Sequence, residues 1–92
     1  KEEPVKAFDE VKNKFFLRMQ VKNTYGVLAC ITKVFGDHKV SIARVVQKAA
    51  EGERAELVIG TEKVKEYHLK DALRELKEME NIYEISSVIR EY

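Results

Sequence analysis

The groups best suited to binding a small molecule lie in the short polar turn Asn23-Thr24-Tyr25-Gly26. An alternating, strand-like run ends just before this turn, and a helix-like run begins at Val27. The first backbone amides of a helix have no partner within it, and together with the helix dipole they favour an anion. Glycine also lets a ligand approach the backbone closely. The amides of Gly26, Val27 and Leu28 are therefore candidates to hold the carboxylate of a small metabolite.

Two roles are open to Asn23 at this turn. Its side-chain amide can supply a donor or an acceptor to an ammonium or hydroxyl group of a ligand. Alternatively, Asn23 caps the helix and Gly26 only makes the turn. A glycine at a strand–helix connection is a weak signal, so both interpretations stay open on spacing alone.

The other reactive side chains predict no catalytic or metal site. Cys30 lies on the expected first helix, and nothing in the sequence places His38 or His68 beside it as a base. Two histidines fall short of the three or four ligands that a metal site needs. The chain also lacks the glycine fingerprint of a dinucleotide site. We therefore expect no catalytic residue, no metal and no cofactor in this chain.

Hydrophobic periodicity predicts the elements that position the turn. A run with a period of two indicates a strand with one buried side, and apolar residues three and four apart indicate an amphipathic helix. Gly36 stands where the first helix is expected to stop, and Gly52 stands in an expected turn at 49–54. The elements are, in order, a strand at 14–21, a helix at 27–37, strands at 39–48 and 55–60, a helix at 64–79 and a strand at 82–90.

This order favours an α+β, ferredoxin-like βαββαβ sandwich, because parallel crossovers are right-handed. We expect one four-stranded antiparallel sheet with both helices on one face, and with the first and third strands in the middle. The strand at 39–48 is then an apolar edge without proline, which favours pairing with a second copy. The open face is a candidate docking surface, expected to carry Phe16, Ala43, Val45, Val58 and Val88.

Composition limits the function classes. The 92 residues suffice for one domain, 36% of them are charged, and the net charge is only +1. This balance argues against nucleic acid as a partner, and no run of apolar residues is long enough for a membrane span. A single cysteine and the absence of a signal peptide make a cytoplasmic setting the expectation. Residues 1–13 are charged and carry the single proline, Pro4, so they are expected to be a tail or the end of an interdomain linker, with a short helix packed on the domain as the alternative. Because the chain begins with Lys1 and not Met, we expect it to be a piece of a longer protein.

The chain resembles an ACT domain, a small amino-acid-sensing module fused to enzymes of amino-acid metabolism. The residues that carry the resemblance are 16–18, 21–29, 40–42 and 45–48. It is similar more narrowly to the C-terminal ACT domain of monofunctional homoserine dehydrogenases, on 46–48, 57–59 and 85–90. Residues 14–92 would form this domain. The resemblance implies that residues 1–13 are the linker or tail from a preceding catalytic part, and that this missing part would bind NADP or NAD. It also implies threonine as the effector, which would inhibit the attached enzyme.

The resemblance also implies where the effector binds, at an interface between two domains in a homodimer. Tyr25 stands where the family usually has proline, so the loop is less pre-ordered, and Tyr25 can cover or block the ligand. Two alternatives remain: a ligand-blind dimerisation module, and an RNA-recognition domain, against which Glu56 on the open face argues. The implied contacts are Asn23, Gly26, Val27 and Leu28 of one copy, and Ser41, Ile42, Val45 and Gln47 of the other.

Overall fold

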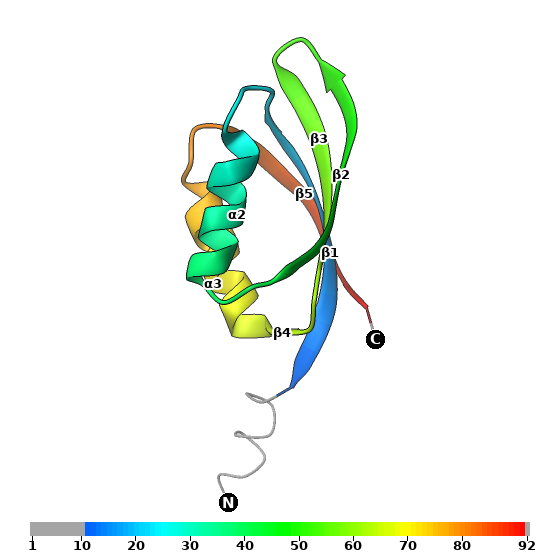
Figure 1. Ribbon diagram of the computed structural model, residues 1–92, viewed down its shortest axis with the longest axis vertical. Helices are drawn as coiled ribbons and strands as arrows, with labels where there is room; N and C mark the ends of the chain where they lie inside the picture. Colours follow the sequence, from blue (N-terminus) through cyan, green and yellow to red (C-terminus); the bar gives the residue numbers. More distant parts are fainter. Residues whose placement is uncertain (1–10, 92) are drawn as a thin grey trace, which may run out of the picture.

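The computed structural model describes residues 11–91, in which two helices cover one face of an antiparallel sheet (Figure 1). The predicted α+β, ferredoxin-like sandwich is confirmed. Most of the expected linker or tail at 1–13 lies outside the described residues, although Lys12 and Asn13 belong to the first strand. The elements are β1 (Lys12–Lys22), α2 (Val27–Asp37), β2 (Ile42–Glu51), β3 (Arg54–Thr61), β4 (Val64–Lys65), α3 (Glu66–Lys77) and β5 (Ile82–Glu91).

The sheet order places β1 and β3 in the middle, with β2 and β5 at the edges, as predicted. The extra strand β4 continues the line of β3 along β1. Gly60 lies opposite Phe16, and Val64 lies opposite Asn13. The first strand thus advances three residues between these two pairs, while the β3–β4 segment advances four. One additional residue is therefore accommodated between β3 and β4, as in a β-bulge.

Thr61 occupies this irregular point of the ladder. It is the buried polar residue of the described core, with 2% of its surface exposed. Its hydroxyl accepts a hydrogen bond from the Phe15 amide at 3.0 Å. A side-chain oxygen thus satisfies a buried backbone donor where the strand pairing is interrupted.

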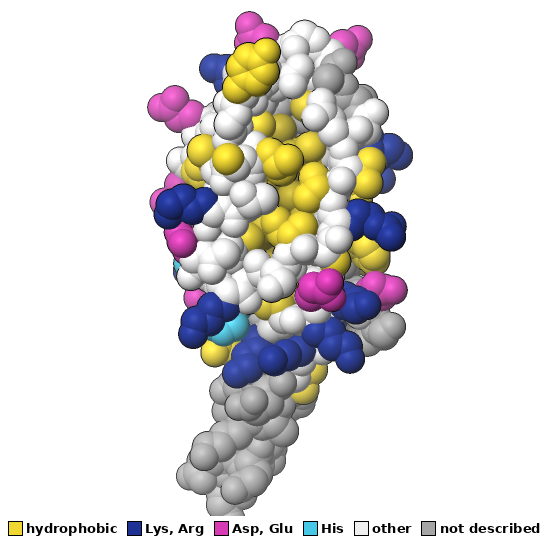
Figure 2. All heavy atoms as spheres, in the orientation of Figure 1, with side chains coloured by type: hydrophobic (Ala, Val, Ile, Leu, Met, Phe, Trp, Pro, Cys, Tyr) yellow, Lys and Arg dark blue, Asp and Glu magenta, His cyan; other side chains and the backbone are white. Residues whose placement is uncertain are grey.

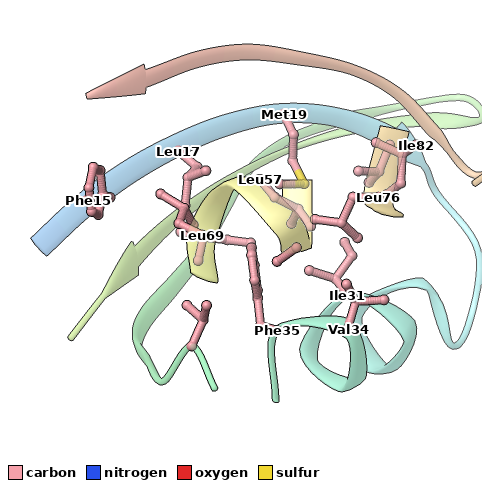
Figure 3. Close-up of a cluster of buried hydrophobic side chains, with 14 of the residues drawn as sticks. Phe15, Leu17, Met19, Ile31, Val34, Phe35, Leu57, Leu69, Leu76 and Ile82 are labelled. Atoms are coloured by element: carbon pink, nitrogen blue, oxygen red, sulfur yellow. The ribbon is translucent and has the colours of Figure 1, made fainter. Parts of the chain in front are cut away.

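The hydrophobic core fills the space between the sheet and the helices (Figure 3). Every second residue of β1 points into it, which is the alternation that predicted this strand. The helices contribute stripes at helical spacing, and burying each large aliphatic or aromatic side chain stabilises the fold by about 1.5–3 kcal/mol. Among the buried residues are Phe15, Leu17, Met19 and Val21 of β1, Ile31, Val34 and Phe35 of α2, and Leu69, Ala72 and Leu76 of α3.

The first helix ends at Asp37 as predicted, but Gly36 is not the residue that stops it. Lys39 takes the left-handed conformation, with φ 65°. Its amide donates to the Gly36 carbonyl at 3.0 Å, and the Val40 amide donates to the Phe35 carbonyl at 2.8 Å. This is a Schellman cap, in which glycine is the usual left-handed residue. Because Lys39 and Val40 belong to the cap, β2 starts at Ile42 and not at residue 39.

The β2–β3 loop and both ends of the second helix also differ from the prediction. The β2–β3 hairpin has a two-residue loop, Gly52-Glu53, and not the longer loop expected at 49–54. Gly52 makes this tight turn with φ 62°, a backbone that glycine adopts without penalty. The second helix is shorter than predicted at both ends, since residues 64 and 65 form β4 and the helix stops at Lys77.

The predicted open face is partly wrong. Val45 lies opposite Ile59 and Val88 lies opposite Leu17, so both belong to the helix-facing side of the sheet. Directly paired residues share a face, and both partners are buried in the core. Phe16 and Val58 do lie on the open face, together with Val46 and Ile89.

Candidate functional site

The turn between β1 and α2 is built around Gly26. Gly26 precedes the first helical residue with φ 85° and ψ −10°, a left-handed conformation that a residue with a Cβ adopts only at a cost. Its carbonyl accepts the first bond of the helix, from Cys30 at 3.0 Å. No side chain caps this end of the helix. The backbone therefore leaves the start of α2 accessible from outside.

The three predicted amides differ in their hydrogen bonding. The Val27 amide donates to the Thr24 carbonyl over 3.4 Å, a long bond for an amide. Within the described residues, the amides of Gly26 and Leu28 donate to no backbone carbonyl. The Tyr25 side chain is fully exposed and packs against none of them. Two of the three groups thus remain available to an anion.

Asn23 does not cap the helix. Its backbone amide donates to the Glu53 carbonyl at 2.7 Å, and its side-chain amide donates to the Gly52 carbonyl at 3.4 Å. Asn23 therefore ties the turn to the β2–β3 hairpin loop. Its alternative role as a helix cap is wrong, and sequence reasoning missed the role as a tether because the partner loop is 29 residues away in the chain.

The predicted residues of β2 share one face of the strand. Val45 and Gln47 lie opposite the buried residues Ile59 and Leu57, so both face the helices. Ile42 faces the same way opposite Thr61, and a bulge separates it from Arg44. Among the described strands β2 pairs with β3 alone, so its other edge offers unpaired backbone groups.

A hydrophobic groove runs between α2 and β2. Figure 2 shows apolar side chains along it, bordered by the helix on one side and the edge strand on the other. Ile42 and Val45 are only partly buried there, and Leu28 of α2 is 41% exposed. Apolar surface left open beside a free strand edge is typical of a surface that another chain covers.

Within one chain, the structure brings only some of these predicted residues together. The Asn23 bonds place the Gly26 turn beside the hairpin end of β2, the end toward which Gln47 lies. Ser41 precedes the opposite end of β2, after the C-terminus of α2. Within one chain, Gly26 and Ser41 thus lie at opposite ends of α2, and a single copy does not bring them together.

The other sequence candidates form no catalytic constellation. Cys30 is exposed, and the His38 ring instead pairs with Glu75 of α3, with 2.8 Å between Nε2 and Oε1. In residues 11–91 no three side chains of the His, Cys, Asp and Glu types are placed to hold a metal ion. Neither helix of this part of the chain is long and apolar enough to cross a membrane.

Fold and turn together define a small ferredoxin-like module with a glycine turn next to a free edge strand. The chain belongs to the ACT domain family, whose model matches residues 15–81. This confirms the resemblance found in the sequence.

Two homoserine dehydrogenases are similar to most of the chain. The enzyme of Bacillus subtilis is 33% identical over 91 residues, covering 97% of this chain. The crystal structure of a homoserine dehydrogenase from Thiobacillus denitrificans superposes with a TM-score of 0.79 and 25% identity over 90% of this chain. The chain spans only 21% and 18% of the lengths of these two proteins.

The fold itself is shared more widely. The ACT domain from the GTP pyrophosphokinase of Chlorobium tepidum superposes with a TM-score of 0.64 at 15% identity, covering 87% of this chain and 99% of that one. At this identity the likeness concerns the fold alone.

Proposed function

We propose that this chain is the regulatory part of a homoserine dehydrogenase and that free threonine binds at the Gly26 turn. The observation that carries the proposal is the accessible start of α2. There the amides of Gly26 and Leu28 are free of backbone partners in the described residues, and the Tyr25 side chain leaves them uncovered. A carboxylate placed against them gains charge-assisted hydrogen bonds together with the favourable end of the helix dipole.

The site is completed by a second copy. In the proposed homodimer, the free edge of β2 in one protomer pairs with its counterpart, and the two grooves between α2 and β2 meet. Ile42 and Val45 of the partner then supply apolar contacts to the effector's methyl group, and its Gln47 supplies a polar contact. Ser41 contributes only in this arrangement, since it lies far from Gly26 within its own chain.

Inhibition is proposed to work by shifting a population. An effector changes the attached enzyme only through its preference for one arrangement of the paired domains, typically about 1–3 kcal/mol. The dehydrogenase reaction and its NADP or NAD belong, in this proposal, to the remainder of a longer protein. The similarity to a fifth of each homoserine dehydrogenase supports that division, with 21% and 18% of their lengths matched.

The proposal is tested by melting the protein with and without millimolar threonine, isoleucine, methionine or lysine. A ligand bound only by the folded state raises the melting temperature, and a concentration 100 times the dissociation constant adds about 2.7 kcal/mol of stability. We expect threonine to give the largest shift. Gln47→Ala should reduce it, whereas Gln20→Ala, on the open face of β1, should leave it unchanged.

The second candidate is a ligand-blind dimerisation module of the same enzyme. The Val27–Thr24 bond favours it, because the protein's own backbone already occupies one of the three amides. This candidate predicts a concentration-dependent dimer and no change in melting temperature with any of the four amino acids. That result would contradict threonine binding and leave dimerisation as the function of the domain.

A further inference from the structure

Lysines from four parts of the chain gather at the end of the sheet farthest from the Gly26 turn. Figure 2 shows Lys and Arg side chains concentrated at this end of the described residues. The lysines come from β1, from the cap of α2, from the connection between β3 and β4, and from β4 itself. This lysine cluster consists of Lys12, Lys14, Lys39, Lys63 and Lys65.

A cleft of about 280 Å³ opens among these side chains. No carboxylate of the described residues lines it. It adjoins a second cleft of about 340 Å³, which shares Lys12 and Lys63 and includes one acid, Glu91. The first cleft is lined by Lys12, Lys39, Lys63, Val64, Lys65 and His68.

Three of the four lysines that line this cleft have no acidic partner among residues 11–91. Within the described part of the chain, no ion pair joins Lys12, Lys39 or Lys63 to a carboxylate. The carboxylate of the nearby Glu66 instead pairs with two other cations, with 3.7 Å between its Oε2 and Nζ of Lys70 and 3.5 Å between its Oε1 and the guanidinium of Arg90. The N-terminal end of α3, which starts at Glu66, adds the positive end of its dipole. Like charges held close together repel one another, and an anion bound among them offsets that repulsion.

Lys39 gives a second, independent indication. It is the one non-glycine residue of the described chain with a positive φ, and it holds the cap position where glycine is usual. The left-handed conformation disfavours an L-residue by roughly 1–2 kcal/mol. Strain of this kind is typical of places where function needs the side chain. Here the residue in the strained position is one of those that line the cleft.

We propose that this cleft binds a compact small molecule carrying two or more phosphate groups. Several ammonium groups match the charge and the acceptor oxygens of adjacent phosphates. The volume suits a small ligand and not an extended polymer. The lysine cluster lies at one end of a chain whose net charge is only +1, which is unlike the extended basic stripe of a nucleic-acid binder. The inference goes beyond the proposed function and does not depend on threonine binding.

The test is a calorimetric titration of the 92-residue chain with tripolyphosphate at constant ionic strength. Lys39→Gly is the informative variant, because glycine relieves the left-handed strain while removing one charge. It should raise the melting temperature and weaken tripolyphosphate binding by roughly tenfold, the effect of losing one charge-assisted hydrogen bond. Lys63→Ala should weaken binding similarly. The control Lys77→Ala, in the last turn of α3, should change neither quantity.

Three outcomes would overturn the proposal. The first is equal binding of tripolyphosphate by the unmodified chain and Lys39→Gly. The second is stabilisation by sodium chloride that matches tripolyphosphate at equal ionic strength, which reports only screening. The third is tighter binding of a single-stranded oligonucleotide than of tripolyphosphate, which indicates a nucleic-acid surface. Each is independent of the threonine melts, so the two proposals fail separately.

Discussion

The ring of Phe16 on β1 lies over the backbone of Gly60, the residue directly opposite it on β3. A Cβ atom at position 60 would lie 3.1 Å from Cε1 of Phe16, closer than side chains normally pack. Gly60 is buried, although its partner Phe16 is 38% exposed on the open face. The ring thus covers a part of the ladder that a glycine leaves without a side chain.

This contact predicts that Gly60 and Phe16 are energetically coupled. Gly60→Ala forces the ring aside and should lower the free energy of unfolding by about 1 kcal/mol. In a Phe16→Ala background the same change should be stabilising by about 0.5–1 kcal/mol, because alanine restricts the unfolded chain more than glycine does. Urea unfolding of the four proteins measures the difference. An equal effect of Gly60→Ala in both backgrounds would show that the ring does not shield this site.

Thr61 predicts a second stability effect. Thr61→Val keeps the shape of the side chain but removes the acceptor of the buried Phe15 amide. An unpaired buried donor costs about 1–3 kcal/mol, so the urea midpoint should fall accordingly. Thr61→Ser keeps the hydroxyl and should lose less. If valine proved as stable as threonine, the hydrogen bond at the β3–β4 irregularity would have no net value.

Local patterns in the sequence predicted α2 well because its apolar stripe and its glycine turn are local signals. They missed the start of β2, since Lys39 gives no sign that it adopts a conformation usual for glycine. They also misplaced Val45, because the irregularity between Ile42 and Arg44 changes which of the following residues of β2 face the core. The tether from Asn23 to Gly52 depends on how the hairpin folds back, which no short stretch encodes.

The pair Lys33 and Asp37 predicts a local pH effect. The Asp37 carboxylate accepts a hydrogen bond from Lys33 at 2.9 Å, and this bond, followed by the charge of Asp37, raises the pKa of Lys33 above its ordinary value of 10.5. Because the pKa of Lys33 is higher in the folded than in the unfolded state, the pair's contribution to folding stability is fully present at a pH below the unfolded-state pKa. That contribution is lost as the pH rises through the folded-state pKa. NMR titration of the Lys33 Nζ should show the raised pKa.

Asp37→Asn is the matched control for that titration. It removes the charge at the end of α2 but keeps the size of the side chain, so the pKa of Lys33 should return towards the ordinary lysine value. Added salt should shrink the difference, because Lys33 is exposed. Identical titration of Lys33 in both proteins would contradict the ion pair.

The exposed position of Tyr25 suggests that a proline there would stiffen the turn. Its side chain makes no packing contact, so replacing it loses little. Tyr25→Pro restricts the unfolded chain and should raise the free energy of unfolding by about 0.4–1 kcal/mol if the backbone accepts proline. A pre-ordered loop should also tighten threonine binding, measured by calorimetry. Tyr25→Ala removes the ring alone and should do neither. If Tyr25→Pro bound threonine more weakly than Tyr25→Ala, the bound turn would need a backbone conformation at position 25 that proline cannot adopt.

Ala43 predicts how the proposed pairing of β2 can be broken without unfolding the protein. It is exposed and lies in the irregularity between Ile42 and Arg44, opposite no residue of β3. Proline is tolerated at such positions but cannot donate to an added strand. Ala43→Pro should therefore weaken the dimer by at least about tenfold in sedimentation equilibrium, with a monomer as stable as before, because added strands associate through backbone hydrogen bonds. Ala43→Ser keeps the donor and should dimerise normally. A dimer unaffected by proline would place the contact on another surface, with the open sheet face around Phe16 and Ile89 the next to examine.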